Sequence, residues 1–166
     1  MTIIVEDDAA IKLDRIAKGE GPYAIIHALL PIHAQRLLSG KHDVFGKYSY
    51  SRYSEVGESL EGCEKLLVYE SHACKQIVGE AKIAGVLLMK SEEIVSRYGK
   101  RFFLKPEELL TYSRSRNSPL VVFELESVKR YPHPVCLRKP ITMGGQYVSK
   151  QMYSRMIGVA FAGSKG

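Results

Sequence analysis

The chain is poor in cysteine and contains no long apolar run. Its 166 residues include three cysteines, Cys63, Cys74 and Cys136. An odd number at wide spacing argues against a disulfide framework. No apolar stretch approaches the roughly 18 residues that a membrane-spanning helix requires, and Met1–Asp8 lacks the basic and apolar segments of a secretion signal. We therefore expect a cytoplasmic protein with no membrane partner.

Common signatures of nucleotide-binding and hydrolytic sites are also missing. The sequence contains neither G-x-x-x-x-G-K-[ST] nor G-x-G-x-x-G, two loops that hold nucleotide phosphates, and neither G-x-S-x-G nor H-E-x-x-H. Two short pairs, His72-x-Cys74 and His133-x-x-Cys136, offer ligands that zinc accepts. Their spacing is not that of a zinc finger, and buried cysteines are a commoner outcome. We expect no metal site and no cofactor.

The charge balance is basic and the length fits one domain. Lysine and arginine number 24 against 18 acidic residues, a net charge of +6, which favours a polyanionic partner. At 166 residues and 45% hydrophobic content the chain can bury one core. The glycines and the proline of Gly19–Pro22 break regular secondary structure and mark a boundary there. We expect an appendage at residues 1–22, a domain at 23–160 and a frayed tail at 161–166.

The hydrophobic pattern predicts more strands than helices. Strand patterns cover residues 23–30, 43–48, 66–70, 76–86 and 120–128, and helix patterns begin at Pro31, Ser91, Pro106 and after Ser149. Several adjacent strands have short connections. This favours an α+β fold with a mixed or antiparallel sheet curled into a small barrel and flanked by short helices. A doubly wound sheet would need regular strand–helix alternation.

Finer details follow from the same pattern. We expect Ile32 and Leu110 to face the core from their helices, Ser91 to cap the helix that it precedes, and the last long strand to end at Val128 because prolines follow it. The glycine pair before Gln146 permits a tight turn or the close approach of a ligand.

A tyrosine-rich stretch, Gly46–Ser54, is the strongest functional signal. In an extended chain it places Tyr48, Tyr50 and Arg52 on one side and Lys47 on the other. Tyrosine rings stack on nucleic-acid bases at roughly 1–3 kcal/mol each, and cations neutralise phosphates. The alternative is an edge strand or loop whose tyrosines lie half-buried over the core.

Two weaker signals allow other chemistry. Arg114 and Arg116 follow a predicted helix, where they can compensate its dipole or contact a second phosphate. Glu70 and Glu80 lie in apolar strands, where desolvation can raise a carboxyl pKa and permit acid–base catalysis. They can equally lie on a solvated strand face.

The order of several short motifs carries a family resemblance over about residues 23–155. The motifs are Pro31–Gly40 with Lys41–Lys47, Leu67–Ser71, Ile77–Ile83, Tyr98–Leu104 and Thr142–Val148. Together they resemble the ASCH group of the PUA-like superfamily, and more closely an archaeal branch of uncharacterised PUA-like proteins.

The resemblance implies a PUA-like pseudo-barrel and a role with RNA or modified nucleotides, in a cleft between the barrel and the helix at residues 31–38. ASCH domains carry G-x-K-x-x-E-x-R after that helix. Gly40 matches, whereas the next three motif positions hold His42, Phe45 and Lys47. The acidic residue is replaced, so the resemblance implies a basic groove more than hydrolysis. Relatives often cage a modified base with tryptophan, which this chain lacks.

We therefore predict a non-catalytic RNA-binding domain with a basic, tyrosine-rich cleft; a tRNA, an rRNA or a modified nucleotide would each fit. The predicted phosphate contacts are Lys41, Lys47, Arg52, Arg114 and Arg116, and the predicted stacking residues are Tyr48, Tyr50 and Tyr69. One alternative is a small hydrolase acting on a modified nucleoside or base through Glu70 or Glu80. Another is a protein-interaction module that pairs through its tyrosine strand. The oligomeric state stays open.

Overall fold

The computed structural model describes residues 22–48, 63–72, 75–114, 118–137 and 145–163. The helices and strands in chain order are β1 (Pro22–Leu29), α2 (Pro31–Leu38), β2 (Val44–Lys47), β3 (Lys65–Glu70), β4 (Gln76–Met89), α4 (Ser91–Tyr98), the 3-10 helix η1 (Gly99–Arg101), α5 (Pro106–Ser113), β5 (Leu120–Cys136), β6 (Gln146–Ser149) and α6 (Lys150–Ala160). Of the predicted appendage, only Pro22 is described. No helix within these ranges is long and apolar enough to span a bilayer.

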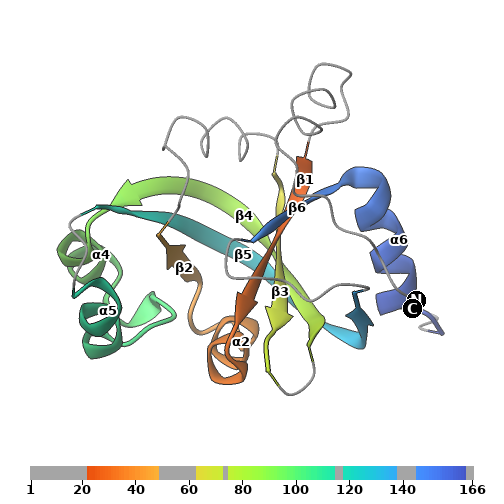
Figure 1. Ribbon diagram of the computed structural model, residues 1–166, viewed down its shortest axis with the longest axis horizontal. Coiled ribbons are helices and arrows are strands. Elements are labelled where there is room, and N and C mark those ends of the chain that lie inside the picture. Colours follow the sequence, from red (N-terminus) through yellow and green to blue (C-terminus); the bar gives the residue numbers. More distant parts are fainter. Residues whose placement is uncertain (1–21, 49–62, 73–74, 115–117, 138–144, 164–166) are drawn as a thin grey trace.

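The strands form one mixed sheet in the order β2-β5-β4-β3-β1-β6. The pair β1–β3 is parallel and the other pairs are antiparallel. α4 and α5 lie at one end of the molecule, α6 lies at the other, and α2 lies between them (Figure 1). This arrangement confirms the predicted α+β class.

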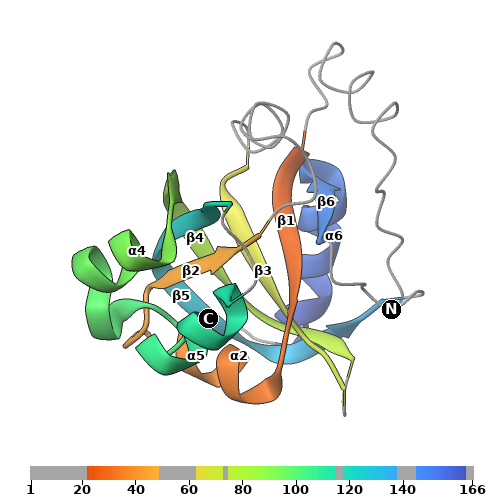
Figure 2. The same cartoon turned by 60° about the vertical axis from the view of Figure 1, so that its left-hand side comes forward.

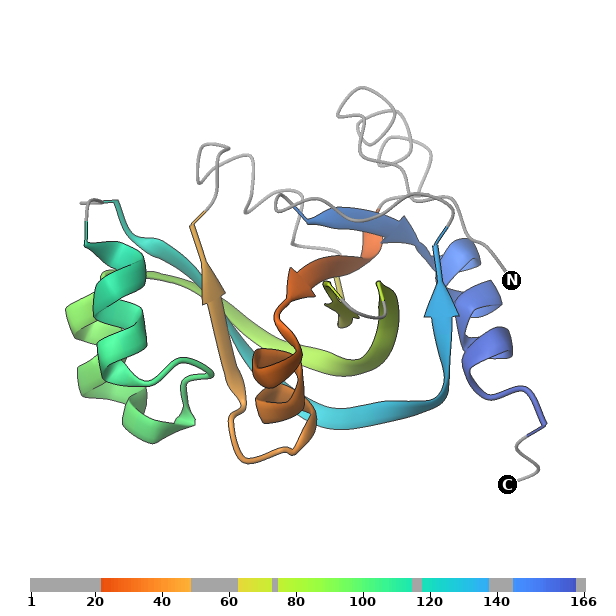
Figure 3. The ribbon, with the colours of Figure 1, turned by 60° about the horizontal axis from the view of Figure 1, so that its bottom comes forward.

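The sheet curls, so strands that are not hydrogen-bonded neighbours come together. β4 and β5 bend along their length (Figures 2 and 3). His27 on β1 lies with its ring centroid 5.3 Å from that of Phe45 on β2, although three strands separate β1 from β2 in the sheet. The fold is therefore a pseudo-barrel, in which side chains rather than backbone hydrogen bonds close the gap.

The two faces of the sheet carry two separate cores. Successive strand residues point to opposite faces, and on β1 Ile25 packs in one core whereas Ile26 packs in the other. The first core joins the sheet to α2, α4 and α5, and the second lies beneath α6 around Met156. A site on one face is thus walled off from the other.

β5 is longer than the sequence predicted. The expected end at Val128 is wrong, because the strand continues to Cys136. Arg130 pairs with Gly79 and Val135 pairs with Ile77, so Pro132 and Pro134 lie within a register shift. Proline has no N–H to donate, and such an irregular stretch tolerates it because the regular hydrogen-bond ladder is interrupted there.

Two helix residues that were expected to face the core face solvent instead. Ile32 on α2 is 54% exposed and Leu110 on α5 is 57% exposed. α2 buries Ala34, Leu37 and Leu38, and α5 buries Leu109. A short helix has only one narrow buried stripe, and neighbours such as Leu109 and Leu110 project about 100° apart.

One predicted helix cap is confirmed and one is wrong. Ser149 Oγ accepts a hydrogen bond from the Met152 N–H at 3.2 Å at the start of α6. At α4 the capping position belongs to Lys90, and Ser91 is the first helical residue. Ser91 is buried there.

Candidate nucleic-acid interface

A cleft of about 840 Å³ opens on the face of the sheet that carries α2 and α5. It is lined by the end of β1, the start of α2, the end of β2, the turn after β3, and the segment from Phe103 through α5. Its volume lies within the range of small-ligand sites, about 300–1,000 Å³. At α2 the cleft is lined by Leu30 and His33.

The cleft walls are largely aromatic and apolar. The ring centroids of Phe45 and Phe103 are 4.9 Å apart, and His33 meets Phe103 edge-on at 5.5 Å. Leu29 and Leu104 complete this surface. Such walls suit a flat, weakly polar ligand, because aromatic rings contribute area and stacking geometry together.

The polar floor of the cleft consists of His27 and Lys47. His27 is 2% exposed, and its Nδ1 lies 3.4 Å from Lys47 Nζ. Burial and then the nearby ammonium lower the pKa of His27 well below its usual 6.5, so the ring is neutral. Burial also lowers the pKa of Lys47 to about 8. At neutral pH Lys47 is therefore mainly an ammonium that can donate to His27.

Gly145 fixes the position of the His27 ring. Its φ is +73°, and a Cβ there would lie 2.5 Å from Cε1 and 2.6 Å from Nδ1 of His27. Only glycine provides both that backbone conformation and that space. The close approach anticipated for the glycine pair is therefore made by a side chain of the protein itself; Gly144 lies outside the described residues.

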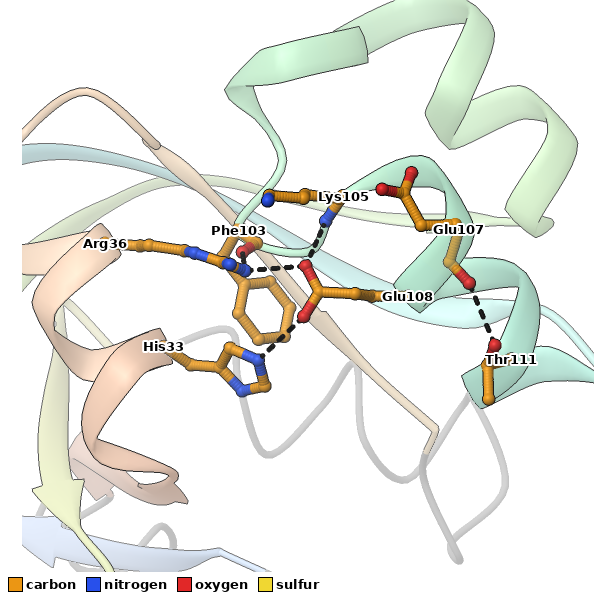
Figure 4. Close-up of polar contacts among 7 residues, drawn as sticks. All are labelled: His33, Arg36, Phe103, Lys105, Glu107, Glu108 and Thr111. Carbon is orange, nitrogen blue, oxygen red and sulfur yellow. Dashed lines mark hydrogen bonds and ion pairs between the residues drawn. The ribbon is translucent and has the colours of Figure 1, made fainter.

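A carboxylate clamp joins α2 to α5 along one side of the cleft (Figure 4). Glu108 Oε1 accepts from Arg36 Nη1 at 2.7 Å and from the Lys105 N–H at 3.0 Å, and Oε2 lies 3.4 Å from His33 Nε2. Arg36 also donates to the Phe103 carbonyl at 3.2 Å. The Lys105 N–H, followed by Arg36 and His33, lowers the pKa of Glu108 to about 2. Glu108 is thus ionised and engaged in holding α5.

Among the residues that the structure describes, Tyr112 is the tyrosine that lines the cleft. It is 43% exposed and lies 5.2 Å from the ring of Tyr48. The Tyr48 N–H donates to the Tyr112 hydroxyl at 3.4 Å. Tyr48 itself is buried, so it supports Tyr112 from behind rather than offering its own ring face.

Other residues predicted to bind RNA are scattered. Lys41 and Arg114 are exposed, and Lys47 lies in the cleft floor. Tyr69 is 2% exposed and packs in the α6 core, away from the cleft, so its ring does not reach a ligand there. Tyr50, Arg52 and Arg116 lie outside the described residues.

The two glutamates of the hydrolase alternative do not line the cleft. Glu80 is buried beneath α6, where it accepts from Tyr131 at 3.1 Å and from Tyr153 at 2.7 Å and pairs with Lys65 Nζ at 3.2 Å. Burial and Glu80 raise the pKa of both tyrosines, so both remain donors. Glu80 therefore fastens α6 to the sheet. Glu70 ends β3 and is half-buried.

Two cation-bearing segments contact each other just before β2. The His42 ring donates to the Lys100 carbonyl at 2.9 Å, and Arg101 binds both carboxylate oxygens of Asp43, at 3.0 and 3.1 Å. These contacts bring Lys41 near Lys100, and both lysines are exposed. Lys105, also exposed, follows Phe103 and Leu104, which line the cleft.

The chain matches a known family over most of its length. The description of that family is "Domain of unknown function (DUF365)", and the match covers residues 22–150. The chain belongs to the DUF365 family. Every residue that lines the cleft falls inside the matched range. The DUF365 chain is also similar to the uncharacterized protein MJECS03 of Methanocaldococcus jannaschii, 25% identical over 104 residues, which are 56% of this chain and 96% of the relative.

Solved structures share the DUF365 fold. ASCH from Zymomonas mobilis superposes with a TM-score of 0.67 at 16% identity, over 82% of this chain and 94% of that one. A serine-to-alanine variant of that protein gives a TM-score of 0.69 at 17% identity, over 84% and 97%. At such identity the likeness shows the fold alone. It confirms the ASCH-type, PUA-like architecture that the sequence motifs predicted.

Proposed function

We propose that this DUF365 protein binds single-stranded RNA and holds one unpaired base in its cleft. The observation that carries the proposal is an apolar, ring-walled cleft with an ammonium in its floor, on a chain of net charge +6. Proteins recognise RNA mainly through unstacked bases, which they stack on rings and contact along their edges. The cleft offers both kinds of contact.

Each part of the surface has a role in this proposal. Tyr112 stacks on a base at the cleft mouth, and Lys47 contacts the base inside. Phosphates lie along Lys41, Lys100, Lys105 and Arg114, all exposed. Tyr50, Arg52 and Arg116 stay proposed contacts in segments outside the described residues. A tRNA, an rRNA or a strand with a modified nucleotide would each provide an unpaired base.

The proposed role is binding without catalysis. Glu108 is the carboxylate among the described residues that line the cleft, and both its oxygens are engaged by α2 and the start of α5. A general base needs a free lone pair within reach of the proton that it removes. Three hydrogen bonds fix the orientation of Glu108, and proton transfer to this carboxylate would weaken the clamp.

Salt dependence tests the proposal. For single strands the log–log slope of affinity against salt is near −0.7 per phosphate contact. The four described cations alone predict a slope of about −3, and Arg52 and Arg116 would steepen it to about −4; fluorescence anisotropy with a labelled single-stranded RNA measures it. Lys100→Gln should flatten the slope by somewhat under one unit, whereas Lys150→Gln on distant α6 should leave it unchanged. Absence of binding at low salt, or a slope near zero, would remove the proposal.

One observation favours a hydrolase as a second candidate. A lysine with a pKa of about 8 in an apolar cleft is partly unprotonated near neutral pH and can serve as a base or nucleophile. The substrate would be a modified nucleoside or base. Turnover of such compounds by the wild type, abolished in Lys47→Met, would place this candidate first.

A further inference from the structure

Two nitrogen-bearing side chains, His27 and Lys47, lie together among the residues that line the cleft. Lys47 has three N–H donors and no acceptor, and His27 Nδ1, 3.4 Å from Lys47 Nζ, accepts from that ammonium. A neutral imidazole that accepts at one nitrogen carries its proton on the other. His27 Nε2 therefore carries an N–H, and the Lys47 ammonium lies beside the same ring.

The Nε2–H group of His27 is a buried hydrogen-bond donor that lacks an acceptor in the described part of the chain. It has no hydrogen-bond partner among the described residues, although the ring lines the cleft and is 98% buried. More than nine in ten buried polar groups in proteins find a partner, so an orphan on a cleft wall or floor points to a missing acceptor. Phe45 and Phe123 flank the ring, with centroids at 5.3 and 5.9 Å, and Gly145 packs against its Cε1 and Nδ1.

In the part of the chain that the structure describes, no wall side chain accepts from His27 Nε2. The Ser71 hydroxyl donates to the Leu29 carbonyl at 2.9 Å, and the Thr111 hydroxyl donates to the Glu107 carbonyl at 3.0 Å. Both hydroxyls thus present lone pairs from the walls, while the Glu108 carboxylate is held by the clamp. A ligand that fits must turn an acceptor toward the floor.

We propose that His27 and Lys47 make the cleft selective for a base that presents a carbonyl oxygen, over a base that presents an amino group at the same position. The selected bases are uracil among the pyrimidines and guanine or hypoxanthine among the purines. Cytosine and adenine would direct amino hydrogens at N–H donors and leave those donors unpaired, which is costly in a buried site. This inference rests on the proposed RNA binding and names its base specificity.

Matched oligonucleotides test the selectivity. We expect oligouridylate to bind the wild-type protein roughly 5–100-fold more tightly than oligocytidylate of the same length, the range that one well-formed edge contact provides. An oligocytidylate with one central inosine should likewise bind more tightly than the same strand with one central adenosine. Anisotropy at neutral pH and low salt gives all four affinities.

Two variants and one control test whether His27 and Lys47 cause the preference for uridine over cytidine. Lys47→Met and His27→Phe should each bring the uridine-to-cytidine ratio close to one, with the salt slope unchanged because neither residue contacts a phosphate in this account. Lys150→Gln should keep the wild-type ratio. If His27→Phe does not fold, Lys47→Met decides alone.

The same measurements distinguish a failure of the proposed RNA binding from a failure of the proposed base selectivity. Absence of binding to every strand at low salt would overturn the proposed function itself. Binding with a ratio near one in the wild type, or a ratio that both variants preserve, would overturn the selectivity and leave RNA binding standing. Loss of the preference on adding inorganic phosphate would show that the floor is an anion site, which also overturns it.

Discussion

At the scale of single residues, Lys47 carries a charge in a site where burial disfavours the charged form of the side chain. Desolvation lowers the pKa of Lys47 to about 8 from 10.5. Below pH 8 the folded protein bears the cost of a partly buried ammonium. Between pH 8 and 10.5 the unfolded chain binds the proton more readily than the folded one, so this cost disappears as the pH rises. A residue kept at such a cost is a candidate for function.

Replacing Lys47 should therefore stabilise the fold while it impairs selectivity. We expect Lys47→Met to raise Tm at pH 7 by roughly 2–4 °C, which corresponds to about 1 kcal/mol in a chain of this size. The gain should shrink as the pH approaches 10.5. Melting curves at pH 7 and 10 check this, with Lys82→Met, an exposed lysine on β4, as the control. A lower Tm at pH 7 would show that Lys47 is retained for stability.

The sequence pointed to Lys47 but not to its partner. Lys47 is part of the tyrosine-rich stretch, whereas His27 stands alone in the apolar run of β1. A histidine inside an otherwise apolar strand was the available signal. The pair itself could not be predicted, because contact between β1 and β2 arises only from the curl of the whole sheet.

At the scale of helices and strands, the α2–α5 clamp sets one side of the cleft. Glu108 accepts from Arg36 on α2 and from the backbone at the start of its own helix. Its pKa is lowered to about 2 from 4.5, so the stability that it contributes is present above pH 4.5 and is lost as the pH falls toward 2. An acid-dependent loosening of α5 follows.

Glu108→Gln tests the clamp. At pH 7 we expect a loss of about 0.5–1.5 kcal/mol, the usual contribution of a partly exposed hydrogen-bonded ion pair. The difference from wild type should fade as the pH falls from 4.5 toward 2, because the unfolded chain gains the proton first and the folded carboxylate gains it only near pH 2. Glu107→Gln, on the exposed side of the same first turn, is the matched control in thermal melts. An equal loss in the control would contradict a specific clamp.

Strands were easier to predict than their arrangement. The five predicted strand segments all correspond to strands, because each has a distinct apolar pattern. The extension of β5 through Pro132 and Pro134 was missed, since proline opposes regular pairing and only the partner strand shows where the ladder is broken. The role of Glu80 was missed for a similar reason, because its partners Tyr131 and Tyr153 lie 51 and 73 residues away.

At the scale of the whole molecule, the sheet separates two tasks. One face carries the cleft with α2 and α5, and the other carries α6, which Glu80 and the second core hold in place. The family resemblance correctly predicted this PUA-like architecture, and a cleft borders α2 in it. It could not assign the lining side chains, because these are set by long-range packing. Tyr112 illustrates this, since its exposure depends on Tyr48 lying behind it.

The central claim, that the cleft mouth stacks an RNA base, is tested most directly at Tyr112. The measurement is the affinity of the wild type, Tyr112→Phe and Tyr112→Ala for one single-stranded RNA, at one low salt concentration and well below Tm. Phenylalanine keeps the ring and should retain most of the affinity, while alanine should lose roughly 5–100-fold, the value of one stacked base. Melting curves of both variants check that they fold, because Tyr112 also contacts Tyr48. Equal affinity in all three proteins would contradict the account.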